Sequence, residues 1–177
     1  MARVAYGDEN SSPAVRALAD QIRKERDGRM LNLYSMLLNA PPVAEGWLAL
    51  FTAIRQQCTL RGDYRELVIL RVALLNGASY EYQVHVPFAL REGVTQAQLD
   101  TLDRWQDSDV LTPAQRAVLA YTDSMTRDIH VPDAVFEALR GHFNQREIVE
   151  LTATIGGYNL VSRFLEALAV DPESAHA

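Results

Sequence analysis

The segment from Asp63 to Leu75 constrains the fold most, because it is the most apolar stretch of the chain. Asp63 and Glu66 have the spacing of a capping box, the side-chain motif that closes the first turn of a helix. Together with the length of the apolar run, this spacing predicts a helix rather than a strand. A helix that is apolar on all sides is surrounded by other elements. We therefore expect this helix at the centre of the fold.

Arg71 is the one charged residue inside the apolar part of this helix. A buried guanidinium needs a carboxylate partner or a bound anion. Both explanations fit the sequence. We therefore take Arg71 as a candidate substrate-binding residue that would hold an anion, with an internal carboxylate as the alternative.

Helix signals recur along the rest of the chain. Ser12-Pro13 and Thr112-Pro113 each combine a capping side chain with a proline at the first helical position. No alternating apolar and polar run predicts a strand, so we expect an all-α fold. The expected helices cover about 13–26, 30–39, 43–57, 63–75, 80–92, 96–105, 113–127, 132–143 and 144–170.

Cys58 is the only cysteine, which excludes an intramolecular disulfide. It ends an apolar stripe at helical spacing, and this position predicts an inert, packed thiol. The members of the stripe are Val43, Trp47, Leu50, Phe51, Ile54 and Cys58.

The length of 177 residues fits a single domain, 1–177, with polar tails at 1–11 and 171–177 that we expect to be flexible. The net charge of −6 disfavours nucleic acid as a partner. No apolar run reaches the roughly 18 residues that cross a bilayer, so we expect no membrane partner. The N-terminus lacks the apolar core of a secretion signal, and we expect a cytoplasmic protein.

Glu81 and His85 lie four residues apart on the expected helix 80–92, so their side chains share one face. A carboxylate beside an imidazole fixes its tautomer and raises its pKa, which suits a general acid or base. The alternative is an ordinary surface pair. A metal site would need more ligands than these two, and we expect neither a metal nor a cofactor.

Glu66 could join this pair. The turn at Asn76-Gly77 predicts an antiparallel hairpin of the two helices, which makes a contact between Glu66 and His85 plausible without forcing it. The alternative is that Glu66 only caps its helix. Glu147 follows the same local motif, but Glu166 rather than a histidine stands at the matching downstream position.

The final helix holds Gly156-Gly157-Tyr158-Asn159 near its middle. Glycines in a helix interior indicate close packing, or space kept for a ligand or a subunit. Tyr158 is a candidate lining residue. Arg163, one turn after Asn159, could face the same space and bind a substrate carboxylate, or could simply be solvated.

These residues carry a resemblance. Glu66, eleven intervening residues, then Ala78-Ser-Tyr-Glu81-Tyr-Gln-Val-His85 and Gly93 resemble the signature of the carboxymuconolactone decarboxylase and alkylhydroperoxidase D superfamily. The resemblance covers about 30–170. It implies an alkylhydroperoxidase D-like helical bundle with a central helical hairpin. It also implies a homo-oligomer, commonly a trimer or a hexamer.

The peroxidase branch of that superfamily uses a Cys-x-x-Cys-x-x-x-His motif, but the matching positions here are Ala78 and Glu81. The resemblance therefore implies the decarboxylase-like branch. We expect cofactor-independent acid-base chemistry on a small organic acid or lactone. His85 would transfer the proton, Glu81 would orient it, and Glu66 would act as a relay acid.

Two alternatives remain open. One is a peroxiredoxin-like or alkylhydroperoxidase-like oxidoreductase that uses Cys58, which requires an exposed thiol with a lowered pKa. The other is a non-catalytic, oligomeric ligand-binding protein on the same scaffold. It predicts a histidine with a pKa near the reference value of about 6.5.

Overall fold

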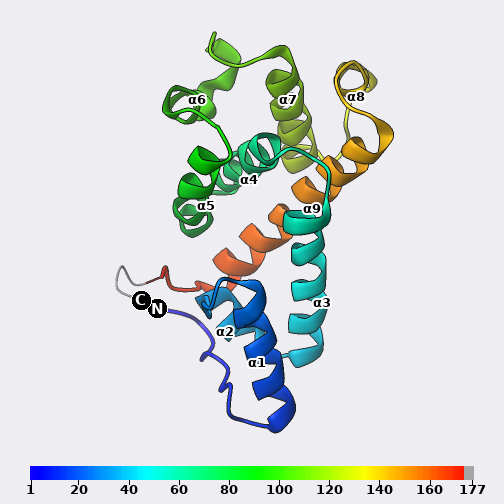
Figure 1. Ribbon diagram of the computed structural model, residues 1–177. Coiled ribbons are helices and arrows are strands. Elements are labelled where there is room, and N and C mark those ends of the chain that lie inside the picture. The colour runs from blue at the N-terminus through cyan, green and yellow to red at the C-terminus, as the bar shows by residue number, and fades with distance from the viewer. Residues whose placement is uncertain (174–177) are drawn as a thin grey trace. The chain divides into compact units, whose positions relative to one another are not determined.

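The computed structural model describes residues 1–173, in which every regular element is a helix (Figure 1). The all-α prediction is therefore confirmed. None of the described helices combines the length and the hydropathy needed to cross a bilayer. The part of the expected C-terminal tail at 174–177 lies outside the described residues.

The described residues form two compact units, and the expectation of a single domain over 1–177 stays a prediction. One unit comprises 1–57 and 164–173, and the other comprises 58–163. Helix α9 (Gln145–Leu168) contributes residues to both units.

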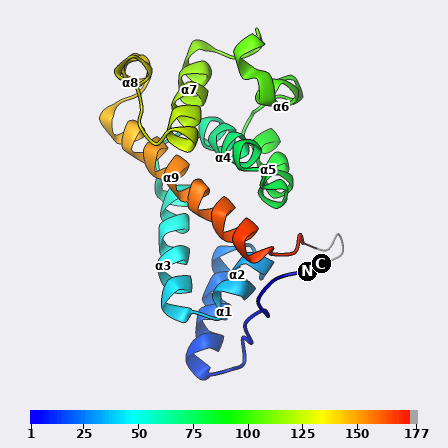
Figure 2. The same cartoon turned by 180° about the vertical axis from the view of Figure 1, so that it is seen from behind.

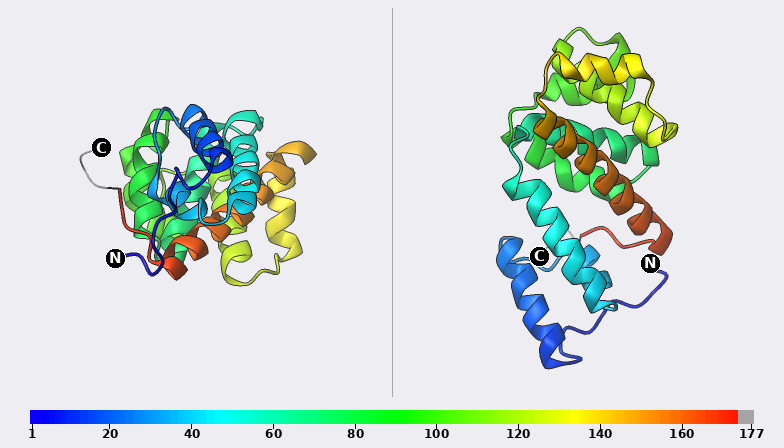
Figure 3. Two further views of the ribbon diagram at one scale, coloured as in Figure 1. Left: turned by 90° about the horizontal axis from the view of Figure 1, so that it is seen from below. Right: turned by 90° about the vertical axis from the view of Figure 1, so that its right-hand side faces the viewer.

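The first unit contains α1 (Pro13–Glu25), α2 (Asn32–Leu37) and α3 (Pro41–Thr52), followed by a π-helical turn, η1 (Ala53–Gln57). Figure 3 shows α1 beside α3, which it contacts. Ser12 caps α1 as predicted, because its hydroxyl accepts a hydrogen bond from the Val15 amide.

The predicted apolar stripe of α3 is only partly buried. Trp47 and Phe51 are buried, but Val43 is 52% exposed and Leu50 is 44% exposed. The buried face is centred closer to Ala44, which is fully buried. Val43 and Leu50 therefore lie at the edge of that face, and their predicted burial is wrong.

The N-terminal segment, expected to be flexible, has partners in the same unit. The Tyr6 hydroxyl donates a hydrogen bond to the Asp171 carboxylate at 2.9 Å. The Gly7 amide donates to the Ser35 carbonyl, also at 2.9 Å. These bonds hold the segment against its own unit, which the polar composition did not indicate.

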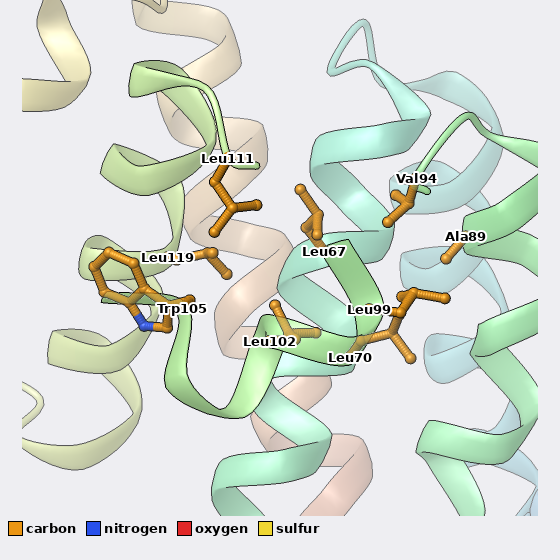
Figure 4. Close-up of a cluster of buried hydrophobic side chains, with 9 residues drawn as sticks. All are labelled: Leu67, Leu70, Ala89, Val94, Leu99, Leu102, Trp105, Leu111 and Leu119. Carbon is orange, nitrogen blue, oxygen red and sulfur yellow. The ribbon is translucent and has the colours of Figure 1, made fainter. Parts of the chain in front are cut away.

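In the second unit α4 (Gly62–Asn76) lies between α5 (Ser79–Arg91) and α7 (Pro113–Arg127), as Figures 1 and 2 show. Nine buried side chains of this unit form a hydrophobic cluster (Figure 4). The cluster contains Leu67, Leu70, Ala89, Val94, Leu99, Leu102, Trp105, Leu111 and Leu119. The other elements of this unit are α6 (Gln96–Thr101), the 3-10 helix η2 (Leu102–Asp107), α8 (Asp133–Arg140) and part of α9.

Gly77 makes the turn between α4 and α5. Its φ of 68° lies in the left-handed region, where a residue without Cβ is favoured, so α4 ends there as predicted. The two helices then pack against each other as the expected hairpin. This hairpin carries the candidate site.

Candidate functional site

His85 lies in the middle of α5, with its imidazole between two carboxylates. Nδ1 is 2.7 Å from Glu66 Oε2, and Nε2 is 3.0 Å from Glu81 Oε1. The three residues, which we call the His85 triad, are only 1–4% exposed. The structure therefore brings together the three predicted catalytic residues and excludes a surface Glu–His pair.

Local spacing and the hairpin together build the triad. Glu81 and His85 meet because they are one helical turn apart. Glu66 comes from α4 and points inward, because the predicted capping box with Asp63 does not form. Asp63 instead pairs with Arg61, with 2.9 Å between the guanidinium Nη2 and the carboxylate Oδ2.

The two carboxylates control the protonation of His85. Burial alone lowers the pKa of the ring, but the hydrogen bonds and charges of Glu66 and Glu81 outweigh it and raise the pKa to about 9. For Glu66, burial raises the pKa, but the bond to His85 leads to a net lowering. At neutral pH the site therefore holds an imidazolium that donates one N–H to each carboxylate.

Aromatic rings flank the imidazole. The ring of Tyr158, from α9, meets it edge-on, with 5.3 Å between centroids and 88° between planes. The Phe88 ring lies 5.6 Å away. Tyr158 is 2% exposed. The predicted lining residue Tyr158 thus contacts the triad and helps to keep water from the ring.

Arg71 does not join the triad. Its guanidinium forms two bonds to the Asp123 carboxylate, of 2.6 and 2.7 Å, and a third to the Leu102 carbonyl at 2.9 Å. The buried guanidinium is therefore paired with an internal carboxylate, which is the alternative that the sequence left open. The anion-binding interpretation of Arg71 is corrected on this ground.

Arg163 is exposed and bonds to its own helix. Its Nη1 donates to the Asn159 carbonyl at 3.1 Å and to the Asn159 side-chain oxygen at 2.7 Å. Asn159 also accepts a bond from the Asn76 amide at 3.1 Å. The exposure of Arg163 agrees with the solvated alternative, and its part in substrate binding stays a prediction.

Arg65 is a site residue that the sequence analysis missed. Its Nε is 3.2 Å from Glu66 Oε1, and its Nη2 is 3.3 Å from Glu92 Oε1. The one sequence feature that could have pointed to Arg65 is its position directly before Glu66. That signal is weak, because adjacent residues on a helix do not normally face each other.

Cys58 follows η1 and is half-buried, so it does not lie on a buried helical stripe as expected. Burial raises the pKa of its thiol, and the nearby Glu150 carboxylate raises it further. Both effects disfavour the thiolate. The peroxidase alternative required the opposite shift.

A pocket of about 230 Å³ lies at the turn between α4 and α5. Ala78, which takes the position of the first family cysteine, is part of its wall. None of the triad side chains lines it. The lining residues are Ala73, Leu74, Gly77, Ala78, Ser79, Tyr82 and Gln83.

Within residues 1–173, no three or more histidine, cysteine or acidic side chains are grouped so that they could hold a metal ion. In the triad, both ring nitrogens of His85 already face carboxylates. The imidazole therefore offers no lone pair to an outside ligand in this state.

Residues 41–124 match the model of the carboxymuconolactone decarboxylase family. The chain is 26% identical over 115 residues to the uncharacterized protein YdfG of Bacillus subtilis, an alignment covering 64% of this chain and 78% of YdfG.

Two solved structures are similar over most of their length. A protein of unknown function from Agrobacterium tumefaciens, which its description links to AhpD, is 26% identical with a TM-score of 0.73, covering 78% of this chain and 95% of that one. An uncharacterized peroxidase-related protein with an AhpD core, from Ralstonia eutropha, shares the fold at 21% identity and a TM-score of 0.84, covering 98% and 93%. Together with the family match over residues 41–124, these likenesses support a carboxymuconolactone decarboxylase and alkylhydroperoxidase D-like fold for this chain, which lacks the cysteine pair of the peroxidase branch.

Proposed function

We propose that this protein is a cofactor-independent enzyme that transfers a proton to or from a small organic acid or lactone. The observation that carries the proposal is the buried imidazole of His85 between Glu66 and Glu81. Perturbed titratable groups of this kind are enriched at catalytic sites.

Decarboxylation of a lactone acid is the model reaction. The bond to the carboxylate carbon breaks, carbon dioxide leaves, and the electron pair moves into a conjugated carbonyl. The resulting enolate then takes a proton on carbon. An imidazolium with a pKa of about 9 holds such a proton at neutral pH. His85 would donate it and regain one from solvent, with Glu81 orienting the ring and Glu66 relaying the proton.

Arg71 takes no part in this reaction, because Asp123 occupies its guanidinium. Arg163 is retained as the exposed cation that would hold the substrate carboxylate. Tyr158 and Phe88 would shield the reacting atoms from water.

The test is the replacement of His85. A general acid or base contributes about 10²–10⁴-fold to turnover. The turnover rate of His85→Ala should therefore be lower than that of the wild type by about this factor. His85→Gln keeps an N–H donor for one of the carboxylates and guards against a folding defect. The assay follows carbon dioxide release from a panel of carboxylated lactones, with circular dichroism as the folding control. Unchanged turnover in folded His85→Gln would remove His85 from the mechanism.

A second candidate function rests on the pocket at the α4–α5 turn. Because none of the triad residues lines this pocket, the scaffold could bind a small apolar molecule without transforming it. The pKa of about 9 for His85 differs from the near-reference value expected of such a protein, so this candidate requires the triad to be a buried ion cluster with a structural role. This candidate predicts that ligands of the pocket bind equally well to the wild-type protein and to His85→Gln, and that neither shows turnover.

A further inference from the structure

We propose that Arg65 is a positioning residue that shares the Glu66 carboxylate with His85 and so loosens the hold of the triad on its proton. This inference rests on the proposed function, because it assigns how that same acid-base group is tuned. Arg65 itself need not touch the substrate.

The geometry divides the Glu66 carboxylate between two cations. Arg65 Nε takes Oε1 at 3.2 Å, and His85 Nδ1 takes Oε2 at 2.7 Å. The Glu66 side chain is 2% exposed and that of Arg65 is 13% exposed. Arg65 is therefore close enough to the interior to act on Glu66 without strong screening by solvent.

Arg65 is fixed at its outer end as well. Its Nη2 lies 3.3 Å from Oε1 of Glu92, whose side chain is 44% exposed. Arg65 belongs to α4, whereas Glu92 directly follows α5. The guanidinium thus links the two helices of the hairpin and is held in one orientation, because its planar fork bonds at both ends.

The charged and titratable groups around the ring determine the sign of the effect. Glu66 faces the imidazole from α4 and Glu81 from α5, while Tyr158 meets it from α9. The two carboxylates stabilise the imidazolium. The positive charge of Arg65 opposes it, because it attracts part of the negative charge on Glu66. Loss of Arg65 should therefore make His85 hold its proton more tightly.

The test measures the proton affinity of His85 by NMR titration of the imidazole nitrogens, which does not depend on any turnover. In Arg65→Met, which keeps the bulk and removes the charge, we expect an affinity about 3–10-fold higher than in the wild type. Arg65→Lys keeps the positive charge, so its His85 should have a proton affinity close to that of the wild type. Glu92→Gln is the matched control, because it removes the outer partner and leaves the bond to Glu66; it should change the affinity less than Arg65→Met does.

An unchanged or lower proton affinity in folded Arg65→Met would overturn the assignment, and so would an Arg65→Lys value equal to that of Arg65→Met. If Arg65 had only a structural role, its variants would lose stability, but the proton affinity of His85 would not rise in Arg65→Met and return in Arg65→Lys. The proposed function fails separately, through full turnover in His85→Gln. Where turnover is measured, the tighter proton in Arg65→Met should shift its pH profile to higher pH.

Discussion

The burial of His85 between two carboxylates links its protonation to folding. The pKa of the ring is about 9 in the folded chain, against an ordinary value of 6.5. Because the folded value is the higher one, the protonated ring stabilises the fold. The contribution is about 3 kcal/mol, is fully present below pH 6.5 and is lost as the pH rises through about 9.

Urea denaturation of the wild type and of His85→Gln between pH 6 and pH 10 measures this contribution. The difference in unfolding free energy between the two proteins should shrink as the pH rises through about 9. The lowered pKa of Glu66 affects stability only as the pH falls toward acid values, outside this window. A difference that stays constant with pH would show that folding does not raise the pKa of His85.

Glu66 and Glu147 offer a comparison of one local motif in two environments. Glu147 forms a genuine capping box, since its carboxylate accepts from the Asn144 amide at 2.9 Å. Glu66 instead pairs with a buried His85. Glu66→Gln should therefore cost about 1.5–3 kcal/mol and lower the pKa of His85, because the ring loses a charged partner.

Glu147→Gln should stay within about 0.5 kcal/mol of the wild type, because a glutamine also completes a capping box. Thermal or urea unfolding measures the stability cost of Glu66→Gln and of Glu147→Gln, and NMR titration measures the pKa of His85 in each variant. Equal costs in the two variants would contradict the distinction between the buried carboxylate and the cap.

At the scale of single residues, the sequence predicts those contacts that depend on local spacing alone. The contact of Glu81 with His85 follows from one helical turn. The role of Glu66 could not be settled in the same way, because a capping box and an inward carboxylate share one local pattern. Which of the two forms depends on where α4 begins, and it begins at Gly62 rather than after Asp63.

At the scale of elements, Arg71 and Asp123 connect three parts of the second unit. Arg71 of α4 bonds to Asp123 of α7 and to the Leu102 carbonyl of η2. The indole of Trp105, also in η2, donates to Asp123 at 3.2 Å. Arg71→Met leaves a largely buried carboxylate without its main partner and should cost about 3–5 kcal/mol.

Arg127→Gln is the matched control. Arg127 also approaches Asp123, at 3.9 Å, but its side chain is 57% exposed. Its loss should cost less than about 1 kcal/mol. The midpoints of urea unfolding for the two variants provide the comparison. A small cost for Arg71→Met would mean that the buried pair contributes little to the packing of α4 against α7.

Element boundaries follow the caps that the sequence shows. Thr95 and Thr112 both form capping boxes, and Gly77 ends α4 in the left-handed conformation. The π-helical turn η1 was not predicted, because residues 53–57 have the same apolar spacing as an ordinary helix. The partner of Arg71 was also beyond prediction, since it lies 52 residues away in the sequence.

For the whole molecule, the resemblance to the carboxymuconolactone decarboxylase family is visible in the sequence, and residues 41–124 match the model of that family, whereas the division into two compact units carries no signal in the sequence. Domain boundaries are read from linkers rich in proline, glycine or polar residues. Here one boundary falls after Gln57, between η1 and the short non-helical segment 58–61, which contains neither proline nor glycine, and the other falls inside α9. The homo-oligomer implied by the resemblance stays a prediction, which multi-angle light scattering would test.

The chain as a whole contains one thiol, so dithiol chemistry within a single chain is excluded by composition. Any thiol-dependent turnover would have to use Cys58. Burial and the Glu150 carboxylate raise the pKa of this thiol above its ordinary value of 9.0. Cys58 should therefore react more slowly with Ellman's reagent at pH 7.5 than free cysteine does, because only the thiolate attacks.

Cys58→Ser should retain the turnover of the wild type, with Cys58→Ala as a second variant that tests packing. Rapid labelling of the native protein, or loss of turnover in both variants, would instead favour thiol chemistry over the His85 triad.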